Sequence, residues 1–173
     1  MGFPYSPGDV LTAADLNASS GLVLLKTINI TDYTGWQPVT GCWSSTFKNY
    51  RIAITGGTTV GGFATNMQVT GAGSNHYSTT QYYTTGTTTG SVAGINGATY
   101  SEVGGSGGTI LDLINVGDAN ENIYYSSVSN DYTYSRWIGG KVLYTAIPTE
   151  ISFSYAGGSF LNATIEVYGY NKG

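Results

Sequence analysis

The run Gly158-Ser-Phe-Leu-Asn-Ala-Thr-Ile-Glu-Val-Tyr-Gly-Tyr170 alternates regularly between two kinds of side chain. Because successive side chains on a strand point to opposite faces, this run separates into two sets. One set is apolar or small, which predicts a core-facing surface. The other is polar but carries three aromatic rings. We therefore expect an interior strand that closes a β fold. The first set is Leu161, Ala163, Ile165, Val167 and Gly169, and the second is Phe160, Asn162, Thr164, Glu166, Tyr168 and Tyr170.

The remainder of the chain from residue 22 also reads as strands separated by turns. About ten strands, turns every 8 to 15 residues and no internal repeat predict an all-β, antiparallel β-sandwich or jelly roll. The Thr/Gly-rich stretch Thr85–Ser91 is expected to be a loop. The expected strands before the closing one are Leu22–Ile30, Val39–Ser45, Tyr50–Ile54, Ala64–Thr70, Tyr77–Thr84, Tyr100–Val103, Thr109–Val116, Ile123–Ser129, Arg136–Thr145 and Glu150–Tyr155.

Residues 1–20 differ from this pattern and are expected to form a separate N-terminal segment, with the sandwich domain spanning 21–173. Thr12 followed by Asp15 fits the start of a short helix, which Gly21 would end. A helix of about two turns is not stable alone, so it must pack on its own domain, on a sister chain or on another protein. As an attachment segment it would act through Asp9, Val10, Leu11, Thr12, Asp15 and Leu16.

Composition excludes several classes of protein. Only 9% of the 173 residues are charged, and the formal net charge is −4. Six cationic residues cannot line a phosphate-binding groove, so we expect no nucleic-acid partner. No stretch is apolar enough to span a membrane, and the N-terminus lacks the pattern of a signal peptide. The single cysteine, Cys42, is expected to be a small buried hydrophobe.

Catalytic and metal-binding patterns are weak, so the chain is interpreted as a non-enzyme without cofactor or metal. The single histidine, His76, stands apart from any Gly-x-Ser-x-Gly motif and is expected in a loop or at a strand edge. Asp112 falls inside an apolar strand, where it needs a partner if it is buried. Asp118-Ala-Asn-Glu-Asn122 starts like a calcium loop but lacks the required glycine and the closing acid, which favours a polar hairpin loop.

Aromatic residues lie among Ser, Thr, Asn and Gly in the second half of the chain. Tyr and Trp provide large, stiff contact area with a polar group, and small polar neighbours supply hydrogen bonds. Three interpretations stay open: ordinary strand residues, subunit packing, and contact with a glycan or receptor. The candidate contact residues are Tyr77, Tyr82, Tyr83, Tyr124, Tyr125, Tyr132, Tyr134, Trp137, Tyr168 and Tyr170.

Five motifs follow one another along the chain: Gly8–Asn17, Gly21–Thr27, Phe47–Ile52, Thr109–Asn115 and Thr164–Tyr170. Taken in this order they resemble a family of small β-sandwich proteins encoded among the tail-fibre and minor-tail genes of tailed bacteriophages. The first motif is similar to a leader at the N-termini of many phage structural proteins. One departure is Glu166, since relatives usually carry Arg or Lys there, so an anionic contact does not transfer.

The resemblance implies a non-enzymatic virion structural protein, a short tail fibre or minor tail protein made in the host cytoplasm. It would attach through its N-terminal segment and display the sandwich, in contact with other virion proteins and with a host-surface glycan or receptor. Low charge and abundant Tyr, with the family analogy, predict a homo-oligomer, most simply a homotrimer. The alternatives are a capsid decoration or head-fibre protein and, from another class, a carbohydrate-binding module.

Overall fold

The structure is a computed structural model. It describes residues 21–56, 64–73, 75–84, 87–92, 96–98, 100–104, 108–130, 134–155 and 159–170, with the backbone alone at 79–84, 87–92, 96–97, 130, 134 and 159. The N-terminal segment, its expected helix and its attachment residues lie outside this part of the chain.

The described residues form thirteen β-strands. In order they are β1 (Val23–Thr34), β2 (Gln37–Thr40), β3 (Asn49–Gly56), β4 (Thr65–Val69), β5 (His76–Thr84), β6 (Thr87–Val92), β7 (Asn96–Ala98), β8 (Ser101–Gly104), β9 (Thr109–Ile114), β10 (Ile123–Asn130), β11 (Tyr134–Val142), β12 (Glu150–Tyr155) and β13 (Ser159–Tyr170).

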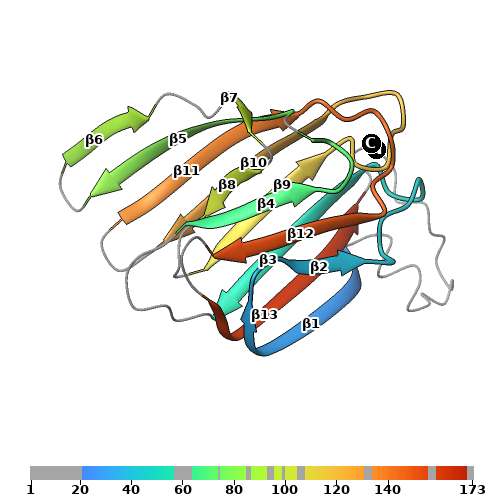
Figure 1. The fold of residues 1–173 in the computed structure, drawn as a ribbon, viewed down its shortest axis with the longest axis horizontal. Coiled ribbons are helices and arrows are strands. Elements are labelled where there is room, and N and C mark those ends of the chain that lie inside the picture. Colours follow the sequence, from blue (N-terminus) through green and yellow to red (C-terminus); the bar gives the residue numbers. More distant parts are fainter. Residues whose placement is uncertain are drawn as a thin grey trace, which may run out of the picture.

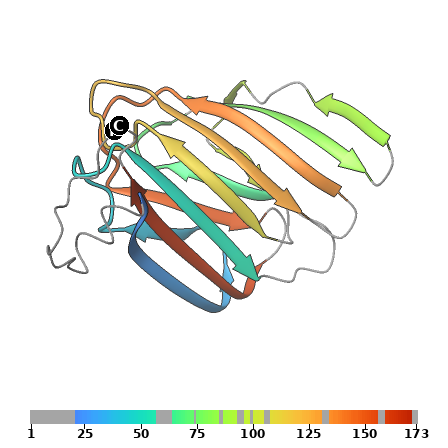
Figure 2. The ribbon, with the colours of Figure 1, turned by 180° about the vertical axis from the view of Figure 1, so that it is seen from behind.

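These strands build two antiparallel sheets that pack face to face, as Figures 1 and 2 show from opposite sides. The large sheet has nine strands in the order β1-β13-β3-β9-β10-β11-β5-β6, with β7 also paired to β5. The small sheet has four strands in the order β2-β12-β4-β8. The fold class expected from the sequence, an all-β antiparallel sandwich, is confirmed.

Several expected element boundaries are wrong: β1 continues to Thr34, and β11 ends at Val142, three residues before Thr145. Most of the stretch predicted as a Thr/Gly loop is strand β6, because Thr favours extended backbone and the segment pairs with β5. The strand expected at Val39–Ser45 ends early as β2 at Thr40, where Gly41 takes a positive φ of 73°. The short strand β7 was not anticipated.

The closing strand β13 lies between β1 and β3, as its pattern predicts. Ala163, Ile165 and Val167 are buried, and Ile165 is paired with Ile28 on one side and Ile54 on the other. Thr164, Glu166 and Tyr168 lie on the opposite face and are only partly covered. This face assignment confirms the sequence-based prediction from Ala163 to Gly169.

The first residues of β13 reverse that prediction. Phe160 is fully buried, whereas Leu161 is partly exposed. The cause lies at Asn162, whose φ of 49° breaks the alternation. The carbonyl of Asn162 lies so close to Gly56 (φ 72°) that no Cβ fits between them. Phe160 thereby enters the core and packs against Tyr155, with ring centroids 4.4 Å apart.

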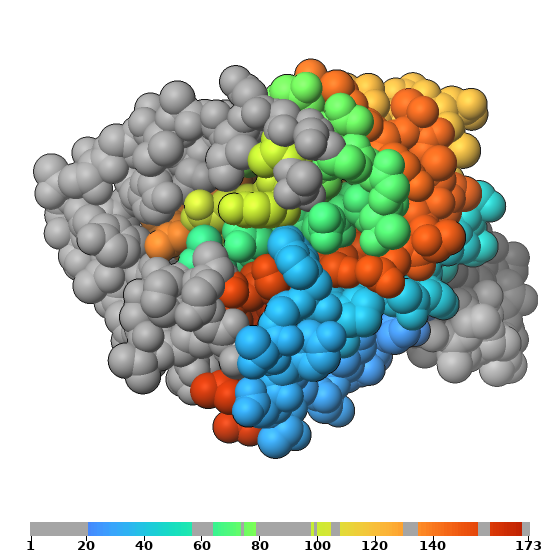
Figure 3. Space-filling model, viewed as in Figure 1, coloured from blue at the N-terminus to red at the C-terminus, as the bar shows by residue number. Residues whose placement is uncertain are grey.

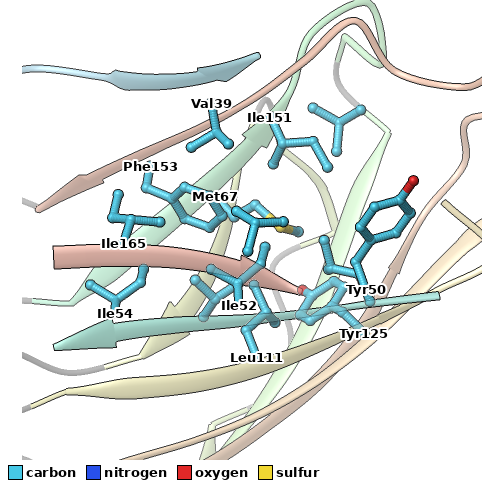
Figure 4. Packing of buried hydrophobic residues seen from close by; sticks show 14 of the residues in the cluster. Val39, Tyr50, Ile52, Ile54, Met67, Leu111, Tyr125, Ile151, Phe153 and Ile165 are labelled. Atoms are coloured by element: carbon cyan, nitrogen blue, oxygen red, sulfur yellow. The ribbon is translucent and has the colours of Figure 1, made fainter. Parts of the chain in front are cut away.

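The small sheet supplies the other half of the core. Val39, Met67, Val69, Ile151 and Phe153 are at most 1% exposed. Figure 4 shows several of them facing the large-sheet residues Ile52, Ile54, Leu111 and Ile165 across the interior. Figure 3 shows the small-sheet side of the molecule, with β12 (orange) and β4 (green) next to the segment that leads into β2 (blue). Cys42 is buried, as expected, and burial raises the pKa of its thiol.

His76 is not in a loop or at a strand edge, as the sequence suggested, but is fully buried at the start of β5. The Val69 N–H donates to its Nε2 at 3.5 Å, which leaves the ring proton on Nδ1, 3.3 Å from Ser101 Oγ. Burial lowers the pKa of His76 to about 4. The imidazole is therefore neutral in the folded protein at neutral pH.

Replacing Ile165 by Ala removes a fully buried side chain between the two sheets. Such truncations cost about 2–5 kcal/mol through lost burial and a residual cavity. Tyr168→Ala, on the opposite face, should cost far less, because Tyr168 is only partly covered and bonds Glu166 in solvent. Chemical denaturation of both variants tests the face assignment. A neutral Ile165→Ala combined with an unfolded Tyr168→Ala would show that the two faces are reversed.

His76 should make stability depend on pH. Between the unfolded pKa near 6.5 and the folded value of about 4, the unfolded chain binds the extra proton, so stability falls as the pH falls through this window. The loss is at most roughly 3–4 kcal/mol, at about 1.4 kcal/mol per pKa unit. His76→Gln should unfold with a flatter pH dependence between pH 4 and 6.5. Parallel pH profiles of the variant and the parent chain would contradict this prediction.

Candidate functional site

Apolar side chains are exposed on the side of the large sheet that faces away from the small sheet. Figure 2 looks onto this side and shows β3, β9, β10 and β11 side by side, with no other described strand across them. The exposed fractions are 45% for Ile110, 42% for Ile114, 45% for Tyr124, 55% for Val128 and 53% for Trp137. A monomeric soluble protein rarely exposes so many large apolar side chains in one place.

We call this surface the outer face. It consists of alternate residues on five neighbouring strands, and the pairing register arranges them in three rows across the strands. The first row is Glu166, Ala53, Ile110, Val128 and Trp137; the second is Tyr168, Arg51, Asp112, Ser126 and Gly139; the third is Tyr170, Asn49, Ile114, Tyr124 and Lys141.

An ion pair lies in the middle row, between the two rows that carry the apolar side chains. Arg51 Nε donates to Asp112 Oδ1 at 2.7 Å, and Arg51 Nη2 donates to Asp112 Oδ2 at 2.8 Å. This bidentate contact raises the pKa of Arg51. The partner that the sequence required for Asp112 is thus a cation on β3 and not a second carboxylate. Asp112 is thereby bound to a permanent cation, an unsuitable arrangement for acid–base catalysis.

A hollow of about 430 Å³ adjoins this ion pair. Its volume lies within the range of small-ligand pockets, although it is open to one side of the sheet. Gly21 and Leu22 border it, so the chain enters the sandwich domain beside the outer face. Burial, together with the negative charge of Asp112, raises the pKa of Tyr170. The hollow is lined by Gly21, Leu22, Asn49, Arg51, Asp112, Ile114, Ser126 and Tyr170.

Small residues lower the surface between the large side chains of β10 and β11. Ser126 separates Val128 from Tyr124, and Gly139 separates Trp137 from Lys141. At about 3.3 Å per residue, Trp137 and Lys141 are roughly 13 Å apart along β11. A Cβ at Gly139 would meet no atom closer than 3.9 Å, so the space above it is open. Lys141 Nζ lies over the Tyr77 ring, 5.6 Å from its centroid.

The structure brings half of the sequence-predicted contact residues to this side of the sheet. Tyr124, Trp137, Tyr168 and Tyr170 lie on the outer face, and Tyr77 borders it beyond Lys141. Tyr82 and Tyr83 belong to β5 and Tyr134 to β11, but their side chains are outside the described part of the molecule, as is Tyr132 entirely.

Tyr125 must be removed from the contact set. It is only 4% exposed, and its hydroxyl donates to the Tyr77 carbonyl at 3.0 Å inside the sandwich. Burial raises its pKa to about 12. The sequence placed Tyr124 and Tyr125 together, but neighbouring strand residues point to opposite faces, so only one of them can be on the outer face.

The aliphatic residues of the outer face were missed at the sequence level. In β9 both alternating sets carry large aliphatic residues, with Leu111 and Leu113 inside and Ile110 and Ile114 outside, on either side of Asp112. A strand of an antiparallel sheet usually has one apolar and one polar face. Large aliphatic residues on both faces of one such strand are therefore the signal that would have revealed an exposed apolar surface.

The described residues hold no group of three or more His, Cys, Asp or Glu side chains placed to bind a metal ion. Asp118 instead caps its own hairpin loop, where its Oδ1 accepts from Asn120 N at 3.0 Å and its Oδ2 lies 3.2 Å from Lys48 Nζ. Among the described residues, no helix is long and apolar enough to cross a membrane.

Two neighbouring glycines test this geometry. A Cβ at Gly140 would collide with the Tyr77 carbonyl and the Tyr125 hydroxyl on the inner face, so Gly140→Ala should cost about 1–3 kcal/mol or more. Gly139→Ala meets open space on the outer face and should be neutral or stabilising by up to about 1 kcal/mol. Thermal denaturation of the two variants provides the comparison. Equal losses would mean that β11 does not have these two faces.

Comparisons with protein-family models, with curated proteins and with solved structures found no significant match to this chain.

Proposed function

We propose that the chain is a non-enzymatic structural protein of a tailed-phage virion, a short tail fibre or minor tail protein that binds its partner through the outer face. The observation that supports a binding role is the group of exposed apolar side chains on β9, β10 and β11. The phage assignment rests on the resemblance of the leader and of the strand motifs.

The chemistry of the outer face suits binding better than catalysis. Ile110, Val128 and Trp137 are stiff or branched side chains that present apolar area at a low cost in conformational entropy. The only carboxylate in the middle row, Asp112, is bound to Arg51 through both oxygens. An apolar surface with a paired charge at its centre resembles the core of a protein interface, where unpaired charges are depleted.

The position of the domain's first residues fits the proposed attachment segment. Gly21 and Leu22 line the hollow at the edge of the outer face. The segment 1–20 therefore joins the sandwich next to the proposed binding surface. Attachment and contact through the outer face would then act on the same side of the domain.

A carbohydrate-binding module is the second candidate, and the hollow beside Arg51 and Asp112 favours it. Its walls carry a guanidinium, a carboxylate and the phenol of Tyr170, groups that hydrogen-bond sugar hydroxyls. Trp137 and Tyr124 are exposed on the same face and offer stacking surfaces. A glycan array probed with the isolated domain separates this function from the structural one. A capsid decoration protein would use the same surfaces, and a cryo-EM map of the parent particle separates head from tail.

Val128→Lys tests the proposed function. Val128 is more than half exposed, so the variant should fold with a change in stability within about ±0.5 kcal/mol. A lysine in the middle of an apolar contact would be desolvated, so the variant should be absent from assembled particles. Deletion of 1–20 should have the same effect on incorporation, with little loss of melting temperature.

Thr149→Lys, an exposed position beside β12, is the matched control and should be incorporated normally. Particle composition is measured by mass spectrometry after complementation of a phage that lacks the gene. Normal incorporation of both Val128→Lys and the deletion would contradict the proposal.

A further inference from the structure

We propose that the partner of the outer face is a second copy of this chain, packed face to face about a two-fold axis that runs parallel to the strands between β9 and β10. This inference rests on the proposed function only in taking the outer face as the binding surface. The charge of the outer face, the sizes of the side chains that would face each other and the available area support a second copy as the partner.

The charge of the outer face suits a copy of itself. The three rows of the outer face contain two cations, Arg51 and Lys141, and two anions, Asp112 and Glu166. The face is therefore neutral overall, and Arg51 and Asp112 already neutralise each other at its centre. A strongly acidic or basic partner would gain nothing from this pattern, whereas a second copy is equally neutral.

Side-chain sizes are complementary across the proposed axis. In a two-fold pairing parallel to the strands, β3 of one copy lies over β11 of the other, and β9 lies over β10. The first row then places Trp137 over Ala53 and Val128 over Ile110. In the middle row, Arg51 faces the open space at Gly139, and Asp112 faces the hydroxyl of Ser126. Trp137 and Arg51, the largest side chains of β3 and β11 in these two rows, thus each meet a small residue.

The other in-plane orientation of the axis is unfavourable. A two-fold axis that crosses the strands along the middle row would place Arg51 over Arg51 and Asp112 over Asp112 of the copy. Like charges facing each other in an interface are costly. The parallel axis avoids every contact of this kind in the three rows. The strands of two packed sheets usually cross at about 30°. A two-fold axis tilted by half that angle, about 15°, from the strand direction produces this crossing and keeps the central rows matched.

The available area is more than half that of a standard interface. About this axis β13 faces β5 of the copy, so six strands at about 4.8 Å and the five residues spanned by the three rows at about 3.3 Å give a flat area of roughly 480 Å². Side-chain relief increases this figure toward the ~800 Å² that each partner buries in a standard complex. A two-fold pairing makes dimers, so the mass of the assembly also decides between this arrangement and the trimer expected from the sequence.

The test is sedimentation of the full chain with a reciprocal exchange of the two facing residues. The parent chain should sediment at twice its 18.1 kDa mass at 100 µM. Ala53→Trp should block close approach and Trp137→Ala should leave a gap, so each should weaken the dimer at least about tenfold. The double variant that carries both changes again places one large and one small residue opposite each other, at positions 53 and 137. It should recover most of the lost affinity. Circular dichroism confirms that each variant is folded.

Each outcome supports or overturns the inference. A parent chain that stays monomeric at 100 µM overturns it. A dimer that Val128→Lys dissociates, but that the exchange fails to restore, overturns the proposed axis. The proposed function fails separately: if Val128→Lys is monomeric yet enters particles normally, the pairing stands and the virion role of the face falls. If the parent is monomeric and Val128→Lys is still excluded from particles, the face binds another protein.

Discussion

The pairing of β9 between β3 and β10 determines both surfaces of the large sheet at once. With Leu111 and Leu113 held inside by the small sheet, alternation forces Ile110 and Ile114 to the outside. A one-residue slip would exchange these sets but would also place Asp112 in the apolar interior. The charge of Asp112 thus fixes the register. Ile110 and Ile114 therefore stay exposed in the single chain, and a partner that packs on the outer face can bury them.

The Arg51–Asp112 ion pair has a role in specificity that differs from its small role in stability. Both side chains are partly exposed in the isolated chain, where such a pair contributes about 0–1 kcal/mol. Covering it removes water from both groups, and the mutual bidentate contact offsets part of that cost. A partner must therefore accommodate a compact neutral unit and leave it intact, which restricts the surfaces that can pack there.

The alternation of side chains along each strand predicted most of the fold from the sequence. It failed where one unusual backbone conformation, or a residue far away in the chain, determines where a side chain points. The faces of β13 were predictable from Ala163 onward, but the left-handed Asn162 reversed Phe160 and Leu161. The partner of Asp112 is 61 residues away in the chain, so no local pattern identifies it. His76 was misplaced because its burial depends on Val69 and Ser101, which come from β4 and β8. Among the candidate aromatic residues whose side chains are described, only Tyr125 points inward, because neighbouring strand residues point to opposite faces.

The central claim is that the outer face is buried when the chain assembles, and hydroxyl-radical footprinting tests it most directly. Oxidation of Trp137, Tyr124 and Val128 is compared in dilute chain and in the assembled state, with Tyr33 and Tyr100, which are exposed elsewhere, as internal references. We predict that oxidation of the three outer-face residues falls several-fold on assembly while the references stay unchanged. Equal oxidation of the outer face in both states would contradict the account.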